Sequence, residues 1–314
     1  MDLDLTRIER AARQIDPVFL GTPQYVEEQL DPRVTVKLET ANPVRSFKGR
    51  GADLMLSTLN PGARVICASS GNFGQAVAYA GRARGMRVEV FVPEHVNPGK
   101  RARMESFGAR LIPAGRDSSA ARAAAAAYAA QPEQAGAVFI SDGLQPEIAE
   151  GAGTIGMELT AGDVFDTIVL PVGDGALITG VARWVKATAP GTRIVGVNAA
   201  GAPSMQLSLR AGHAVAIERA DTFADGIAIS SPIEESVRRA MALVDEMVLV
   251  TDEAIADAME RAARTIGVLL EPAGAAGLAA IATGQAGGER IATVLTGANP
   301  RPEQLADLAA RLGR

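Results

Sequence analysis

The sequence has little cysteine, no surplus of basic residues and no long hydrophobic run, and each absence removes a class of protein. Cys67 is the only cysteine among 314 residues, so no disulfide can form within the chain. Lys and Arg number 31 against 36 Asp and Glu, a net charge of −5, so nucleic acid is not an expected partner. No apolar run reaches the roughly 20 residues that cross a bilayer, so no membrane partner is expected.

The sequence also lacks the patterns of a secretory signal peptide and of the common nucleotide-binding motifs. The first ten residues, MDLDLTRIER, are charged and contain no apolar signal region, which favours a cytoplasmic protein. The chain has no GxxxxGK[ST] segment and no well-formed GxGxxG after a first strand, so neither ATP nor NAD is an expected ligand. The segment most similar to a dinucleotide-binding motif is Gly151-Ala152-Gly153-Thr154. It lacks the preceding strand and the later acidic residue that such a site needs. A plain nucleotide-binding α/β protein therefore remains only a disfavoured alternative.

Hydrophobic residues make up 47% of the chain, enough for a large core, and they follow a regular alternation. Short β-branched runs alternate with Ala-rich helical stretches, a pattern typical of parallel βαβ units and an α/β fold. Ligands collect beyond the carboxyl ends of strands in such sheets, so the turns there are the candidate sites. The predicted strands are 34–38, 63–68, 87–92, 110–112, 137–140, 167–170, 193–198, 247–250 and 291–295, and predicted helices include 73–84, 98–107, 118–130, 176–189 and 252–265.

The first candidate segment is SFKGRGA, which follows the strand ending at Leu38. A lysine between Phe47 and Gly49 is usually a surface residue. The functional alternative is that Lys48 is a nucleophile, which requires a partly apolar site that favours the neutral amine. Phe47 and Arg50 are compatible with such a site.

The second segment, SSGNFGQ, follows the strand ending at Ala68 and opens a helix. Its small residues leave backbone N–H groups free at a helix N-terminus, which suits a carboxylate. A turn capped by Ser and Asn explains the same pattern equally well.

Two further segments follow later strands. PVGDGAL, from Pro171 to Leu177, has the strand, glycine turn and helix order that suits a phosphate held by backbone amides. LTGAN, from Leu295 to Asn299, ends the last apolar strand and offers a hydroxyl, Thr296, that could meet a ring nitrogen. Each is weak alone, because glycine turns and Asn caps are common.

Taken together and in this order, the four segments resemble the threonine and serine dehydratase family, within the pyridoxal phosphate (PLP) enzymes of the tryptophan synthase β-subunit fold type. ADGIAI (224–229) and EPAGAAGLAA (271–280) also match dehydratase segments, and the resemblance runs from about residue 22 to 299. It implies a two-lobed α/β protein with open, twisted, mainly parallel sheets flanked by helices. Residues 1–62 and 144–314 would form the large cofactor-binding lobe, and 63–143 a small mobile lobe.

The resemblance also implies roles for single residues. Lys48 would carry PLP as a Schiff base beside Phe47, and Asn72 would contact the cofactor ring and substrate. The substrate carboxylate would be bound by Ser69, Ser70 and Gly71, with Phe73 next to it. The phosphate would be bound by Gly173, Asp174, Gly175, Ala176 and Leu177. Thr296 would meet the pyridine nitrogen.

The sequence departs from the family pattern at several of these positions. The phosphate loop usually reads Gly-Gly-Gly-Gly, but Asp174 and Ala176 replace two glycines here. An acid there should repel a phosphate unless its side chain points away. Phe73 stands where the family often has His, and Ser70 stands where serine racemases carry Ser and many threonine dehydratases Ala. Segment 198–204 (NAAGAPS) lacks the acidic residues of the racemase divalent-metal site, so no metal is expected.

The expected reaction is α,β-elimination from a small hydroxy amino acid, with Lys48 as the general base, giving a 2-oxo acid and ammonia. Alternatives within PLP chemistry are a threonine synthase-like reaction, amino-acid racemisation with Ser70 as the second acid–base group, a diaminopropionate lyase and β-replacement. A non-catalytic PLP-binding or regulatory protein is a further alternative. The family implies a homodimer.

Overall fold

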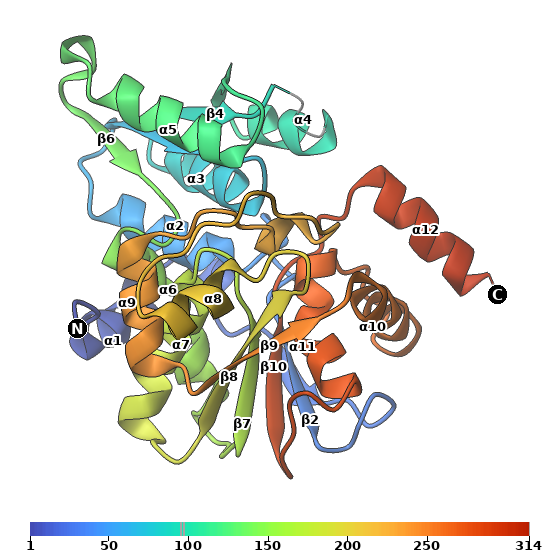
Figure 1. Cartoon of the computed structure of the whole chain (residues 1–314). Coiled ribbons are helices and arrows are strands. Elements are labelled where there is room, and N and C mark those ends of the chain that lie inside the picture. The colour runs from blue at the N-terminus through green and yellow to red at the C-terminus, as the bar shows by residue number, and fades with distance from the viewer. Residues whose placement is uncertain (95, 97, 314) are drawn as a thin grey trace.

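The structure is a computed structural model that describes residues 1–94, 96 and 98–313. Its strands form one sheet of six strands and one of four, and helices flank both (Figure 1). All pairings within the two sheets are parallel except that of β1 (Gln24–Val26) with β2 (Val34–Leu38). The predicted α/β class with mainly parallel sheets is confirmed.

The larger sheet has the strand order β1-β2-β10-β7-β8-β9. Its central strands are buried on both faces and read as continuous apolar runs, which is typical of parallel sheets covered on both sides. β1 was not predicted, because it is a three-residue edge strand with two exposed residues and carries little hydrophobic signal. The remaining strands are β7 (Thr167–Pro171), β8 (Arg193–Ala199), β9 (Glu246–Val250) and β10 (Ile291–Leu295).

Neighbouring residues of one strand pack into different cores, because successive side chains point to opposite faces. In β7, Ile168 and Leu170 join one hydrophobic cluster, whereas Val169 joins the other. The first cluster is closed by α1 (Leu5–Gln14), α2 (Lys48–Ser57), α6 (Pro146–Leu159), α7 (Ala176–Thr188), α8 (Ser204–Ala211) and α9 (Glu234–Leu243). The second is closed by α10 (Asp252–Thr265), α11 (Pro272–Ala282) and α12 (Pro302–Leu312).

The smaller sheet has the order β5-β4-β3-β6 and is parallel throughout. The predicted helix 118–130 is α5 (Ser118–Ala129), which packs on this sheet through Ala121 and Ala125, and Cys67 of β3 is buried. The other elements are β3 (Arg64–Ala68), α3 (Asn72–Ala83), β4 (Arg87–Val92), α4 (Pro98–Ser106), β5 (Arg110–Pro113) and β6 (Ala137–Ile140). The four strands fall within 64–140, although the division into lobes stays a prediction.

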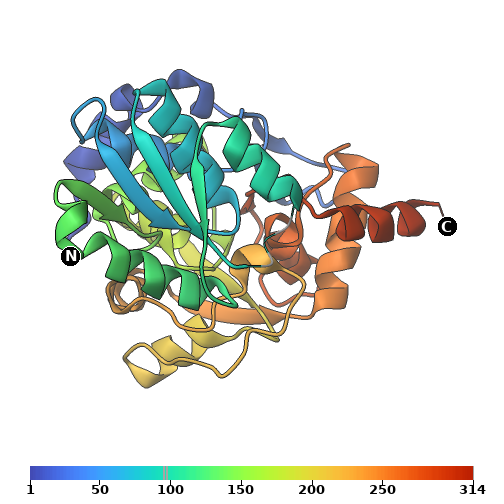
Figure 2. The ribbon, with the colours of Figure 1, turned by 90° about the horizontal axis from the view of Figure 1, so that it is seen from above.

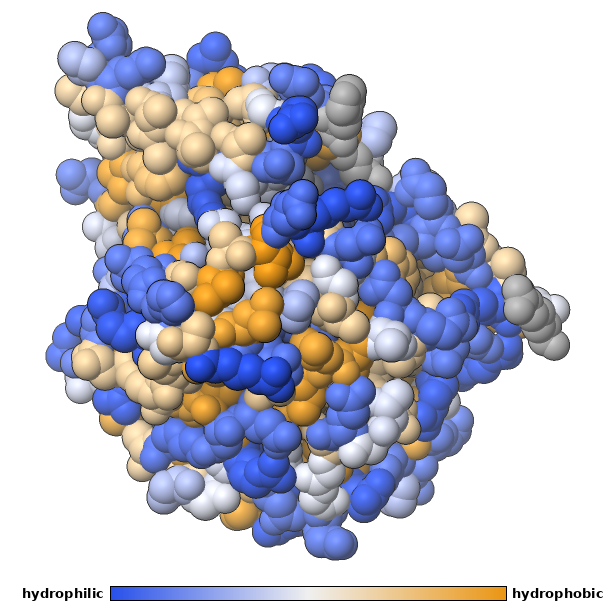
Figure 3. Space-filling view, viewed as in Figure 1, coloured by the Kyte–Doolittle hydropathy of each residue, from blue (hydrophilic) through white to orange (hydrophobic). Residues whose placement is uncertain are grey.

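Short 3-10 helices join these elements, namely η1 (Pro17–Phe19), η2 (Pro132–Gln134) and η3 (Asp225–Ile227). The helix α12 near the C-terminus extends from the body in both views (Figures 1 and 2). Hydrophilic residues cover most of the face in Figure 3, and hydrophobic ones gather below the upper part that carries the small sheet. Among the helices of the described residues, none is both long and apolar enough to cross a membrane.

Candidate active site

A cavity of about 350 Å³ lies between the two sheets and receives residues from both. The segments after β3, β6, β7 and β10 all reach it, as expected for turns at the carboxyl ends of parallel strands. The predicted site residues all line it: Phe47, Lys48, Ser69, Ser70, Gly71, Asn72, Phe73, Gly173, Asp174, Gly175, Ala176, Leu177 and Thr296. Their individual roles stay predictions.

Lys48 is the first residue of α2. Its ammonium forms an ion pair with the Asp142 carboxylate and lies 4.6 Å from the centroid of the Phe47 ring. The Lys48 side chain is only 16% exposed. The Phe47 N–H donates to the backbone oxygen of Thr296 at 3.1 Å, which ties the lysine segment to the end of β10.

The Asn72 side chain is fixed by two polar neighbours at the start of α3. Its amide nitrogen donates to Glu271 Oε1 at 2.5 Å, and its oxygen accepts a hydrogen bond from Asn299 Nδ2 at 2.9 Å. Burial raises the pKa of Glu271, whereas the cation of Lys100 lowers it. An amide held at both ends presents one defined face to the cavity.

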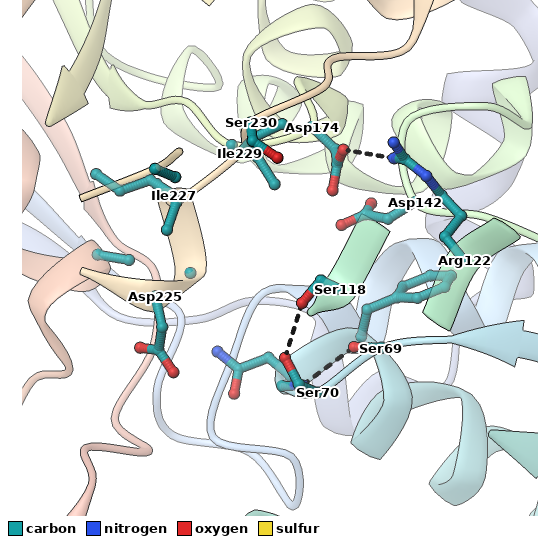
Figure 4. Close-up of a pocket in the computed structure, with 18 of the residues that line it drawn as sticks. Ser69, Ser70, Ser118, Arg122, Asp142, Asp174, Asp225, Ile227, Ile229 and Ser230 are labelled. Carbon is teal, nitrogen blue, oxygen red and sulfur yellow. Dashed lines mark hydrogen bonds and ion pairs between the residues drawn. The ribbon is translucent and has the colours of Figure 1, made fainter. Parts of the chain in front are cut away.

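The small-residue turn before α3 leaves polar groups facing the cavity. The Gly71 N–H donates to Ser69 Oγ at 3.2 Å, and Ser70 Oγ lies 3.4 Å from Ser118 Oγ at the start of α5 (Figure 4). Phe73 lines the cavity but is 3% exposed and belongs to the hydrophobic core. Its ring therefore contributes packing beside the turn.

The glycine turn after β7 has the shape of an anion cradle. Gly175 precedes α7 with φ +92°, and a Cβ on Gly173 would lie 2.8 Å from the Gly226 oxygen. Only glycine allows so close an approach of the two backbones. The first-turn N–H groups of α7 have no acceptor within the helix, so a phosphate fits this turn.

Asp174, within that turn, points its side chain into the cavity and not away from it. Its Oδ1 lies 3.5 Å from Arg122 Nη1 of α5 (Figure 4). Ser236 Oγ donates a hydrogen bond to its backbone oxygen. Burial and the neighbouring Asp142 carboxylate raise the pKa of Asp174, and the cations of Arg122 and Lys48 oppose that rise. The side chain therefore does not point away from the cavity, which was the condition for avoiding repulsion of a phosphate, and its effect on a bound phosphate stays a prediction.

Several residues of the cavity were missed by sequence reasoning. Asp142 follows β6, and its position after a predicted strand was the one available signal. Further polar contacts join the elements of the small sheet to the segment 225–231. They are the Lys100–Asp225 ion pair at 2.5 Å, the Ser119–Ser230 contact at 3.3 Å and the hydrogen bond from Arg122 to the Ser231 oxygen at 2.8 Å.

The family model for pyridoxal-phosphate dependent enzymes matches residues 19–297. The chain belongs to this family. The family, the fold type and the PLP cofactor predicted from the motifs are thereby confirmed. The glycine cradle, the largely buried Lys48 and the fixed Asn72 amide all fit this cofactor.

Two curated relatives are named as a threonine ammonia-lyase and a threonine dehydratase. The chain is 34% identical to an L-threonine ammonia-lyase of Thermotoga maritima over 95% of this chain and 76% of that protein. It is 36% identical to the biosynthetic threonine dehydratase of Arabidopsis thaliana chloroplasts over 83% of this chain, but this match spans only 44% of that protein. The chain thus spans about half the length of this longer relative.

Solved structures show the same fold. A processed threonine deaminase of Solanum lycopersicum superposes with a TM-score of 0.87 at 31% identity, covering 99% of this chain and 89% of that one. Maize serine racemase superposes with a TM-score of 0.87 at 27% identity, covering 99% and 98%.

Proposed function

We propose that the protein is a PLP-dependent lyase that converts a small hydroxy amino acid, threonine or serine, into a 2-oxo acid and ammonia: water is eliminated first and is taken up again when the C–N bond is hydrolysed. The observation that carries this is that Lys48, the Ser69–Gly71 turn and the glycine cradle all open into one shared cavity. Its relatives of 34% and 36% identity are named for threonine deamination, which favours threonine over other substrates.

Each group of the cavity has a role in this reaction. PLP, held by Lys48 and the glycine cradle, would supply a sink for the electron pair left when the Cα–H bond breaks. The Ser69–Gly71 turn and the α3 N-terminus bind the substrate carboxylate, and Asn72 orients the reactants. The Lys48 amine takes the α-proton as general base. Loss of the β-hydroxyl with a proton releases water, and hydrolysis of the C–N bond then gives the 2-oxo acid and ammonia.

We further propose that residues 63–143 form a small mobile lobe and that 1–62 with 144–314 form the cofactor lobe. The contacts of Ser119 with Ser230 and of Arg122 with Ser231 cross between these two parts. Closing the small lobe over bound substrate excludes water from the reacting carbon. The family resemblance is also our basis for proposing a cytoplasmic homodimer, which a measurement of the solution mass would test.

The test is a Lys48→Ala variant assayed beside the wild type with threonine, serine and their D-forms. We expect the wild type to show a visible cofactor band and to release 2-oxo acid and ammonia. The variant should lose the band and at least about 10³-fold in turnover, because it lacks both the attachment point and the base. A variant that keeps colour and turnover would refute the assignment of Lys48.

Racemisation is the second candidate, because the Ser70 hydroxyl faces the cavity from a different segment than Lys48 (Figure 4). A second acid–base group could return a proton to the opposite face of the α-carbon. Ser70→Ala should then abolish racemisation and leave elimination largely intact. If the wild type converts neither enantiomer of serine or threonine into the other, racemisation is excluded for them.

A further inference from the structure

Asp174 stands in the phosphate cradle at a position where the family usually has glycine, and the mechanism above gives it no role. Its side chain is 17% exposed and lines the same cavity as Lys48. The hydrogen bond from Ser236 Oγ to its backbone oxygen holds the turn, and its carboxyl group faces the cavity. An acid is therefore held beside the place where the cofactor phosphate fits.

The charges around Asp174 come from three other elements. Asp142, after β6, lies next to it and carries the same charge, and Figure 4 shows the two carboxyl groups close together. Lys48, at the start of α2, pairs with one Asp142 oxygen, whereas Asp142 Oδ1 is buried and has no hydrogen-bond partner among the described residues. Arg122 of α5 is the cation nearest to the Asp174 carboxyl, at 3.5 Å.

A phosphate bound in the cradle adds a third negative group to this cluster. Phosphate monoesters carry a charge of about −1.5 to −2 near neutral pH. Burial and Asp142 already raise the pKa of Asp174, and the charge of a bound phosphate acts in the same direction.

We propose that Asp174 binds the cofactor phosphate in its protonated form, donating an O–H hydrogen bond to a phosphate oxygen, so that the chain takes up a proton when it binds PLP. This rests on the proposed position of the phosphate in the glycine cradle. Because proton uptake is coupled to PLP binding, the affinity for PLP is highest at low pH, where free Asp174 is already protonated. The affinity falls as the pH rises through and above the range in which free Asp174 ionises.

The test uses calorimetric titration of cofactor-free protein with 4-deoxypyridoxine 5′-phosphate. This analogue has the phosphate but no aldehyde, so its binding is independent of Schiff-base formation at Lys48. Titrations in two buffers of different ionisation enthalpy, from about pH 6 to about pH 9, count the protons taken up for each ligand bound. Asp174→Asn, which cannot ionise, and Asp174→Gly, which restores the usual family residue, measure the protons contributed by the ligand itself.

Because burial and Asp142 raise the pKa of free Asp174 to about 7, we expect the wild type to take up about half a proton more than either variant near pH 7, and close to one proton more above about pH 8. As the pH rises, the dissociation constant of the wild type for the analogue should increase by up to about tenfold per pH unit relative to the dissociation constants of the two variants. Asp142→Asn should move this extra dependence to lower pH, because it removes the carboxylate that opposes ionisation of Asp174. Circular dichroism of each variant checks that it folds.

Equal proton uptake in the wild type, Asp174→Asn and Asp174→Gly would overturn the inference about Asp174 and leave the lyase proposal standing. Failure of the folded wild type to bind both the analogue and PLP would overturn the phosphate position and with it the proposed function.

Discussion

Gly175→Ala tests the shape of the phosphate cradle directly. Gly175 has φ +92°, a conformation that costs an L-residue about 1–2 kcal/mol. A Cβ there would lie 2.3 Å from Ser236 Oγ, which must rotate away and lose its hydrogen bond to the Asp174 oxygen. That loss adds about 1 kcal/mol. The expected decrease in the free energy of unfolding is therefore about 2–3 kcal/mol.

Matched glycines separate the two contributions. Gly62 has φ +75°, and a Cβ added to it would have no atom within 4 Å, so Gly62→Ala should cost only the conformational part. In a Ser236→Ala background the contact is already absent, and Gly175→Ala should then cost about 1–2 kcal/mol.

Urea unfolding of the cofactor-free proteins gives these values, and the dissociation constant for PLP gives the functional effect. We expect weaker PLP binding in Gly175→Ala and unchanged binding in Gly62→Ala. If Gly175→Ala is as stable as the wild type, the left-handed backbone conformation assigned to Gly175 is wrong. If it costs no more than Gly62→Ala, the Ser236 contact contributes nothing.

Two further predictions concern stability away from the cavity. Gly180→Ala should lower the free energy of unfolding by about 3 kcal/mol in urea, because its Cβ would lie 1.9 Å from the Ala149 oxygen where α7 crosses α6. Gly162→Ala is the control: its Cβ would have no atom within 4 Å, and its free energy of unfolding should be within about 0.5 kcal/mol of the wild type. The pKa of Glu158 is lowered to about 2: burial works against this, but the hydrogen bonds from Arg50 and Lys37 outweigh it. Its stabilisation, on the order of 3 kcal/mol, is present above the unfolded pKa near 4.5 and should be lost as the pH falls towards 2. Glu158→Gln should be less stable near neutral pH and lack this part of the acid dependence, and an unchanged dependence would refute the assignment.

Local patterns predicted most of the fold. Strands 34–38, 87–92, 137–140 and 291–295 have the predicted bounds, because buried parallel strands are short β-branched runs bounded by turns. β1 escaped prediction because its pairing with β2, and not its own three residues, makes it a strand. The motif residues were found because each lies in a contiguous segment that a family resemblance can match.

Cavity residues that lie outside these contiguous motifs could not be found by matching segments to a family. Asp142, Arg122 and Ser230 belong to three different segments, and no short pattern connects them. They meet in one cavity only because the two sheets direct their carboxyl ends towards each other.

The alternation of strands and helices, the family and the cofactor could all be inferred from the amino-acid sequence, because each depends on local patterns or on contiguous motifs. The same motifs identified Asp174 as a departure and predicted the repulsion of a phosphate. The folded chain was needed to show that the Asp174 side chain faces the cavity, and that Asp142, Lys48 and Arg122 surround it. The charge state of a buried carboxyl group depends on its desolvation and on neighbours distant in the chain, and both are fixed only when the two sheets pack around one cavity.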